Sequence, residues 1–151
     1  EGELSVMFAA FARTLVLVDP WSWEENRRHG YVCTMGGPDK TQAELDEMLE
    51  SVKVRLEAIR LERRQHIRIY RMSSLEAAKH YGDSLDMVFI DSVHTHAYLS
   101  QEIEAWLPKL RPGGIMAGDD YVGEVQQAVD ERFGAKVNVA GNVWWVKKEQ
   151  A

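Results

Sequence analysis

Two acidic points in the sequence could do chemistry together, because each one ends a short apolar run. Asp91 closes the run 87–90, and the pair Asp119-Asp120 closes the run 114–118. Short apolar runs bounded by turn residues predict buried strands of a parallel sheet. If these strands are adjacent, three carboxylates converge at one edge of the sheet, which is where open α/β folds bind ligands. A divalent cation is the simplest reason for such a convergence.

The segment between the two strands predicts the helix that would make them parallel. Its apolar residues recur at helical spacing and would form one face, made of Leu99, Ile103, Trp106, Leu107 and Leu110. A strand, a helix and a strand in this order form a βαβ crossover, so both strands point the same way.

Two histidines lie close to these acids in the sequence. His94 follows Asp91 by three residues, and an imidazole with a pKa near neutrality can act as a base that removes a hydroxyl proton. A purely structural histidine is the alternative. His96 is the weaker candidate, since it either faces solvent on the first turn of the helix or supports the same site.

The composition is that of a soluble globular protein. The 151 residues are 45% hydrophobic and 28% charged, which fits a single domain over residues 1–151 with a substantial core. The net charge of −6 argues against nucleic acid as the main partner. No apolar run approaches the roughly 20 residues that span a bilayer. We therefore expect no membrane contact. The single cysteine, Cys33, cannot form an internal disulfide, so we expect a cytoplasmic protein.

The rest of the chain alternates helices and strands. We expect helices over residues 4–12, 74–81 and 122–133. A further helix should begin at the capping box of Thr41 and Glu44 and end at about residue 64. We expect strands over 14–18, 66–72, 136–139 and 142–147, the last two forming a hairpin. Residues 21–40 predict a long loop, in which Trp21 and Trp23 could wall a substrate pocket. Of Trp144 and Trp145, one should be core and the other exposed or at an interface, which leaves a homodimer open.

Two blocks of this chain resemble a known family. They are Phe89-Ile90-Asp91-Ser92-Val93-His94, and Leu107-Pro108-Lys109-Leu110-Arg111-Pro112-Gly113-Gly114 through Gly118-Asp119-Asp120-Tyr121. With them the chain resembles the class I S-adenosylmethionine-dependent methyltransferases. It is most similar to the metal-dependent small-molecule O-methyltransferases, including the bacterial branch that methylates sugars and macrolide sugars.

The resemblance implies a fold. The expected class is α/β, a Rossmann-like, doubly wound, mostly parallel sheet with a C-terminal antiparallel β-hairpin. That hairpin is typical of the family and is not expected of a nicotinamide-dependent dehydrogenase, which is a rival interpretation. A doubly wound sheet would begin with a strand leading into the turn at Gly2, so the first strand is expected to be missing and the domain to be N-terminally incomplete.

The resemblance also implies roles for individual residues. The cofactor S-adenosylmethionine would be held by Gly2, Asp19, Met72, Ser73, Ser74 and Asp91. Asp19 would bind the ribose hydroxyls, and residues 72–74 would line the adenine pocket. Turn formation by Gly2 and Asp19 and helix capping by Ser74 are the alternatives.

A metal and a substrate follow from the same resemblance. Asp91, Asp119 and Asp120 would hold Mg²⁺ or another divalent cation, and His94 would be the base. The family's glycine-rich opening is reduced to Glu1-Gly2, and Val93 stands where an acid is frequent. The implied activity is O-methylation of a small-molecule hydroxyl, on a sugar or a vicinal diol. An inactive, truncated module that binds or assembles is the alternative.

Overall fold

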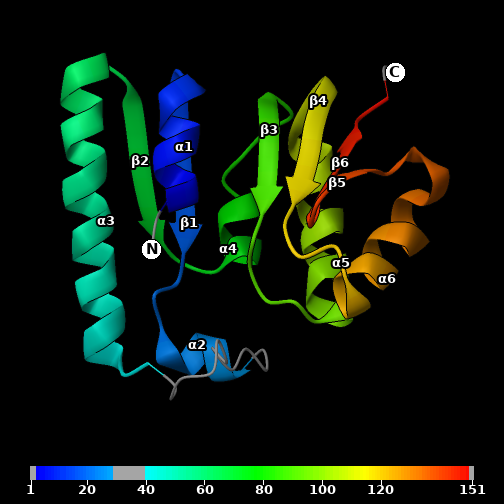
Figure 1. Ribbon diagram of the computed structural model, residues 1–151, viewed down its shortest axis with the longest axis horizontal. Helices are drawn as coiled ribbons and strands as arrows, with labels where there is room; N and C mark the ends of the chain where they lie inside the picture. The colour runs from blue at the N-terminus through cyan, green and yellow to red at the C-terminus, as the bar shows by residue number, and fades with distance from the viewer. Residues whose placement is uncertain (1–2, 29–39, 150–151) are drawn as a thin grey trace. The chain divides into compact units, whose positions relative to one another are not determined.

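The computed structural model describes residues 3–28 and 40–149 (Figure 1). These residues divide into two compact units, the first made of residues 3–28 and 40–74 and the second of residues 75–149. Each unit has its own β-sheet, with two strands in the first and four in the second. The single domain expected from the length of the chain stays a prediction.

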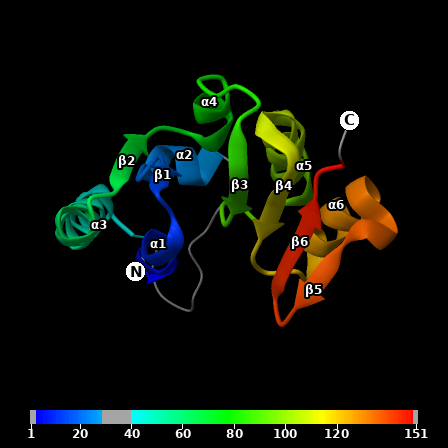
Figure 2. The same cartoon turned by 90° about the horizontal axis from the view of Figure 1, so that it is seen from above.

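The first unit is a parallel pair of strands covered by helices. Its elements are α1 (Glu3–Phe11), β1 (Thr14–Asp19), α2 (Trp23–Arg28), α3 (Gln42–Arg63) and β2 (His66–Arg71). The two strands pair in register from Thr14 opposite His66 to Asp19 opposite Arg71. Figure 2 shows α1 and α3 on the same side of this pair. Between them lies a core of Ala9, Val52 and Leu56, against which Leu15, Leu17, Ile67 and Ile69 pack.

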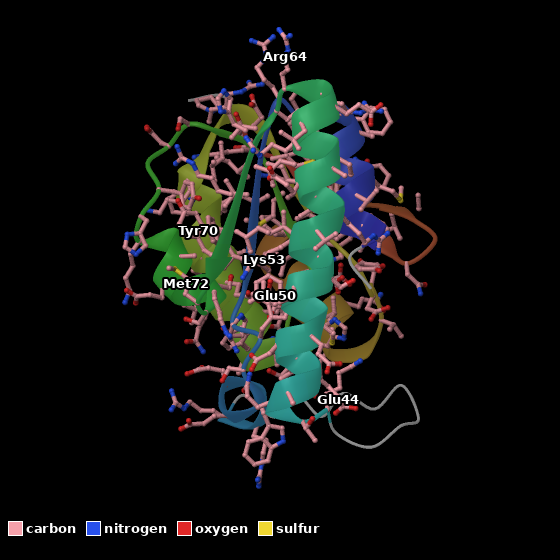
Figure 3. The ribbon with its side chains drawn as sticks, turned by 90° about the vertical axis from the view of Figure 1, so that its left-hand side faces the viewer. Glu44, Glu50, Lys53, Arg64, Tyr70 and Met72 are labelled. Carbon is pink, nitrogen blue, oxygen red and sulfur yellow. The ribbon has the colours of Figure 1, made fainter. Side chains whose placement is uncertain are left out.

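The capping box predicted at the start of α3 is confirmed. The backbone N–H of Glu44 donates to Thr41 Oγ1 at 3.3 Å, and the backbone N–H of Thr41 donates to Glu44 Oε2 at 2.7 Å. These bonds satisfy donors that a helix start otherwise leaves unpaired. The bond from the Thr41 N–H to the Glu44 carboxylate also lowers the pKa of that carboxyl. The helix is followed by Arg64, labelled in Figure 3, which caps its end in a left-handed conformation with φ 54°.

The loop predicted over residues 21–40 is wrong in its first part. Residues 23–28 form α2, whose start is capped by Ser22 Oγ, which accepts from the backbone N–H of Glu25 at 3.3 Å. Glu24 and Glu25 at its start pair with Arg28 at its end, an arrangement that favours a short helix. Residues 29–39 lie outside the described residues.

The second unit is a mixed four-stranded sheet. Its elements are α4 (Ser74–Ala78), which begins at the boundary, β3 (Leu85–Ile90), α5 (His96–Trp106), β4 (Leu110–Gly118), α6 (Gly123–Phe133), β5 (Asn138–Ala140) and β6 (Val143–Lys147), with 3₁₀ turns at Leu107–Lys109 and Gly134–Lys136. The strand order is β3-β4-β6-β5. β3 and β4 are parallel, whereas β6 is antiparallel to both β4 and β5. The predicted βαβ crossover and the predicted terminal hairpin are both confirmed.

One face of this sheet is packed against α5 and α6, as Figure 2 shows. The buried residues of the sheet include Met116, Trp144 and Val146, and the Trp144 ring lies 6.4 Å from that of Phe133 at the end of α6. The two helices contribute buried residues of their own, among them Leu99, Ile103, Trp106, Val125, Ala128 and Val129. The apolar face predicted for the segment 95–110 is therefore a core face.

The strand predicted over 114–118 is longer in the structure. β4 begins at Leu110, which pairs with Leu85 of β3. Lys148 extends the pairing with β6 by one residue: its N–H donates to Gly114 O at 2.8 Å, and Gly113 N–H donates to Lys148 O at 3.0 Å. The Lys148 ammonium also donates to Leu110 O at 2.6 Å. These partners are more than thirty residues away in sequence, so local composition could not indicate them.

Candidate active site

The residues predicted to bind the ribose and adenine parts of a cofactor come together within the first unit. Asp19 ends β1 and pairs with Arg71, the last residue of β2. Met72 and Ser73 therefore leave the sheet next to Asp19, and Ser74 is the first residue of α4. Figure 3 shows Met72 just beyond the end of β2. Gly2 lies outside the described residues.

Asp19 organises the turn that follows it. Its Oδ1 accepts from the backbone N–H of Trp21 at 2.6 Å, and Trp21 adopts a left-handed conformation with φ 39°. The carbonyl oxygen of Trp21 accepts from Gln42 Nε2 at 2.9 Å and from Arg71 Nη2 at 2.8 Å. A non-glycine residue with positive φ persists only where its surroundings hold it, and here three side chains do so.

The interpretation of Trp21 as a pocket wall is wrong. Its side chain is buried, with 6% exposed, and it packs in a cluster with Leu45 and Leu49 of α3. Trp23 is 39% exposed, and the guanidinium of Arg27 lies 4.7 Å from its ring centre. Trp21 is therefore a core residue that anchors the turn after Asp19.

The hollows found on the first unit lie along α3 and β2. One of about 630 Å³ is lined by Asp46, Glu47, Leu49, Glu50, Lys53, Ile69 and Arg71. Another of about 460 Å³ is lined by Lys53, Val54, Leu56, Glu57, Arg60, Ile67 and Ile69. Neither includes Asp19 or residues 72–74. Their charged lining is largely paired within itself, for example Lys53 with Glu50 at 2.6 Å and Arg71 with Asp46 at 2.5 Å, so we assign no chemistry to them.

The predicted acidic edge is formed in the second unit. β3 and β4 point the same way in Figure 1, and Ile90 pairs with Gly118 at the end of their ladder. Asp91 and Asp119 therefore leave neighbouring strands at one edge, and the backbone N–H of Asp119 donates to Ile90 O at 3.2 Å. Asp120 follows with a left-handed φ of 52°.

His94 lies between two of the three carboxylates. Its Nδ1 is 3.4 Å from Asp120 Oδ2, and its Nε2 is 3.7 Å from Asp91 Oδ1. Asp91 has the largest influence and raises the pKa of His94, although the 3.7 Å separation exceeds a normal hydrogen bond, and the charges of Asp120 and Asp119 add to this. Partial burial opposes the shift without reversing it. His94 therefore lies beside two of the predicted acids, and its role as a base stays a prediction.

The three acids lie at one edge of the sheet, but in this structure their side chains do not surround a single metal position. Among the residues that the structure describes, no group of three His, Cys, Asp or Glu side chains is arranged to hold a metal ion. Asp119 Oδ1 instead accepts from the backbone N–H of Asp120 at 2.9 Å. The chemistry of the donors still fits a divalent cation, because carboxylate oxygens from two adjacent strand ends are the ligands that Mg²⁺ takes.

His96 belongs to a different contact. Its backbone N–H donates to Glu124 Oε2 at 2.8 Å, and its Nε2 is 2.7 Å from Glu131 Oε2. Both glutamates are on α6, so His96 joins the start of α5 to α6. Its side chain is partly exposed on the first turn of α5, as the first alternative expected, and its contacts are with α6.

Close packing fixes the strand end that carries Asp119 and Asp120. A Cβ placed on Gly118 would lie 2.6 Å from Ile90 O and 2.7 Å from the Trp144 ring, so only glycine fits there. Beyond the acids, the backbone N–H of Tyr121 donates to Asn142 O at 2.8 Å, and its hydroxyl donates to Asp130 at 2.5 Å. The hydrogen bond to Asp130 raises the pKa of the Tyr121 phenol.

Sequence reasoning missed the buried acid behind the site. Glu102 of α5 is 1% exposed and accepts a hydrogen bond from Ser92 Oγ. The sequence spacing could have indicated its burial. Glu102 is three residues after Leu99 and four before Trp106, and so lies on the predicted core face.

A comparison with protein families matches this architecture. The family model described as a methyltransferase domain matches residues 1–121, which is most of the chain. The chain belongs to this methyltransferase domain family. No curated protein matches it. No helix among residues 3–28 and 40–149 is long and apolar enough to cross a membrane.

Solved structures share the fold at low sequence identity. A methyltransferase from Geobacter sulfurreducens is 11% identical over 99% of this chain and 67% of its own, with a TM-score of 0.56. The apo form of a TDP-rhamnose 3′-O-methyltransferase of calicheamicin biosynthesis is 12% identical over 97% and 66%, with a TM-score of 0.54. A protein from Corynebacterium glutamicum is 18% identical over 91% and 62%, with a TM-score of 0.53. The chain thus spans about two thirds of the length of these structures, and they establish its Rossmann-like fold.

Proposed function

We propose that this protein transfers a methyl group from S-adenosylmethionine to a hydroxyl of a small molecule, and that His94 accepts the hydroxyl proton. The observation that carries the proposal is the position of His94, within 3.7 Å of Asp91 and 3.4 Å of Asp120 at the carboxyl edge of β3 and β4. Membership of the methyltransferase family supports the reaction class.

The reaction asks little of the protein beyond alignment and an ionised nucleophile. The substrate oxygen forms a bond to the methyl carbon, the carbon–sulfur bond breaks, and S-adenosylhomocysteine leaves as a neutral thioether. Neutral His94 takes the proton, and the resulting imidazolium is stabilised by the carboxylates of Asp91 and Asp120. Stabilising a charge that appears during the reaction is what a fixed acidic pair can contribute.

We propose the following residues as contacts of the cofactor. Asp19 would accept from the ribose hydroxyls with the two oxygens of its carboxylate, and Met72, Ser73 and Ser74 would contact the adenine. Gly2 and Asp91 complete the proposed set. Gln42 and Arg71 both donate hydrogen bonds to the carbonyl oxygen of Trp21, in the turn after Asp19. These bonds reduce the conformational entropy that the turn would lose on binding a ligand, which supports this assignment.

We further propose that Asp91, Asp119 and Asp120 hold Mg²⁺ or another divalent cation. When bound, such an ion lowers the pKa of a coordinated hydroxyl and fixes the position of its oxygen. We propose a sugar or vicinal diol as substrate. One protein of the same fold, the TDP-rhamnose 3′-O-methyltransferase, acts on a sugar hydroxyl, which supports this choice. The net charge of −6 supports a small molecule over nucleic acid.

Isothermal titration with S-adenosylhomocysteine tests the cofactor proposal. We expect binding by the protein, and a loss of about 10- to 100-fold in affinity for Asp19→Ala, the usual consequence of removing a hydrogen-bonded charge. The matched control is Asp86→Ala at the amino end of β3, which pairs with Arg111 and should bind normally. Absence of heat with the wild-type protein would favour the alternative, an inactive module of the same fold.

A further inference from the structure

Glu102 is a buried carboxylate in a helix face that is otherwise apolar. It is 1% exposed on α5, among Leu99, Ile103 and Trp106, which are 3%, 1% and 7% exposed. Removing a carboxyl group from water is unfavourable unless hydrogen bonds compensate, so buried positions on a helix face are usually apolar. Core packing alone therefore does not explain a glutamate here.

The contact of Glu102 points to the segment that carries the candidate base. Its Oε2 accepts from the hydroxyl of Ser92, which lies between Asp91 and His94. Residues 91–95 belong to no helix or strand, so individual contacts rather than a regular ladder fix their conformation. The C-terminal end of this segment is held by the backbone N–H of Leu99, which donates to Thr95 O at 3.0 Å. The hydrogen bond of Ser92 holds its start.

We propose that Glu102 is a positioning residue that acts through Ser92. It ties the segment 91–95 to the core of α5 and so sets the orientation of Asp91 and His94 toward Asp120. Its effect on turnover rests on the function proposed above, whereas its effect on the order of residues 91–95 does not.

Three substitutions separate positioning from stability. Glu102→Leu keeps the volume and removes the acceptor, Glu102→Gln keeps an acceptor oxygen for Ser92, and Ser92→Ala removes the donor. The matched control is Glu104→Leu, since Glu104 is on the same helix but is exposed and pairs with Arg132. Because Ser92→Ala is a small change, it carries the test if Glu102→Leu fails to fold.

The kinetic readout is the split between kcat and the KM for S-adenosylmethionine. We expect Glu102→Leu and Ser92→Ala each to lower kcat by about 10- to 100-fold, the scale of a displacement of about 1 Å at a reacting centre, with an unchanged KM. Glu102→Gln should recover most of the loss. The double variant should lose no more than either single one, because both remove the same contact.

The structural readout is backbone amide hydrogen exchange, which needs no turnover. Faster exchange over residues 91–95 in Glu102→Leu, at an unchanged melting temperature and reversed in Glu102→Gln, supports the proposal. Wild-type exchange there in both Glu102→Leu and Ser92→Ala overturns it. If the wild-type protein methylates no hydroxyl acceptor, the proposed function fails, while the exchange data still decide the role of Glu102.

Discussion

His94 combines a raised pKa with a position between acids, and this sets the direction of its pH dependence. A base must be neutral to accept a proton, and the pKa of His94 is raised above its usual value of about 6.5 by Asp91, Asp120 and Asp119. Turnover of the wild-type protein should therefore rise with pH through a value above 6.5. The same acids that stabilise the imidazolium as a product thus hold part of the histidine in its inactive form near pH 7.

Replacing His94 should lower turnover most at low pH, where the substrate hydroxyl does not ionise without a base. We expect His94→Gln to lower kcat by about 10²- to 10⁴-fold at pH 7, the usual contribution of a general base, and by less at pH 9. The measurement is a kcat profile from pH 6 to 9. The control is His96→Gln, which removes the contact with Glu131 and should leave the profile in place. Equal losses for His94→Gln at both ends of the range would refute the role of a base.

Asp120 gives a test of the proposed cation. Its φ of 52° disfavours most residues, so Asp120→Asn is the better variant, since asparagine tolerates the left-handed region while losing the charge. We expect it to abolish Mg²⁺-stimulated turnover and to leave the affinity for S-adenosylhomocysteine within about twofold, because Asp120 is not assigned to the cofactor. The measurements are a Mg²⁺ titration of activity and a calorimetric titration. Asp86→Asn is the matched control. An unchanged response to Mg²⁺ in Asp120→Asn would refute the proposed metal site.

At the scale of elements, the ends of β3 and β4 position the three acids. The end of β4 can lie where it does only because residue 118 is glycine. Gly118 lies against Ile90 O on one side and the Trp144 ring on the other, with no room for a Cβ. Trp144 is 1% exposed and is itself held against Phe133 of α6. The position of Asp119 and Asp120 therefore depends on the contact between β4, β6 and α6.

A methyl group at Gly118 should be costly. We expect Gly118→Ala to lower the free energy of unfolding by about 1–3 kcal/mol, the usual cost of overpacking, and to reduce turnover because the acidic turn moves. Urea denaturation and kcat are the measurements. Gly82→Ala is a suitable control, since a Cβ at Gly82 would meet nothing within 4 Å. A Gly118→Ala variant as stable as the wild type would show that the Trp144 ring can move to make room for the added Cβ.

At the scale of the whole molecule, each unit has a core of its own. The first is built on Ala9, Val52 and Leu56, and the second includes Ile103, Met116 and Val129. We expect Leu56→Ala, at a side chain that is 2% exposed, to cost about 2–5 kcal/mol. Hydrogen exchange should show the loss of protection in α3, β1 and β2. An equal loss of protection from exchange throughout residues 75–149 would mean that the chain unfolds as one cooperative domain, as its length suggests.

The fold could be predicted well wherever the signal was local. The β3–α5–β4 crossover follows from two apolar runs and one helical face, and the capping box at Thr41 fixes the start of α3. The terminal hairpin follows from a turn between two alternating segments. The helix over residues 23–28 was missed because its stabilisation comes from Ser22 and from pairs among charged residues that also suit a loop.

The sequence alone determined the β3–α5–β4 crossover, the terminal hairpin and the family resemblance that implies the fold class, because periodicity, turn residues and motifs are local features of the chain. Only the tertiary structure decided that Trp21 is core, that His96 joins α5 to α6, that Glu102 accepts a hydrogen bond from Ser92, and that His94 lies beside Asp120. Each of these depends on side chains that meet across ten or more residues, and such contacts leave no periodic trace in composition.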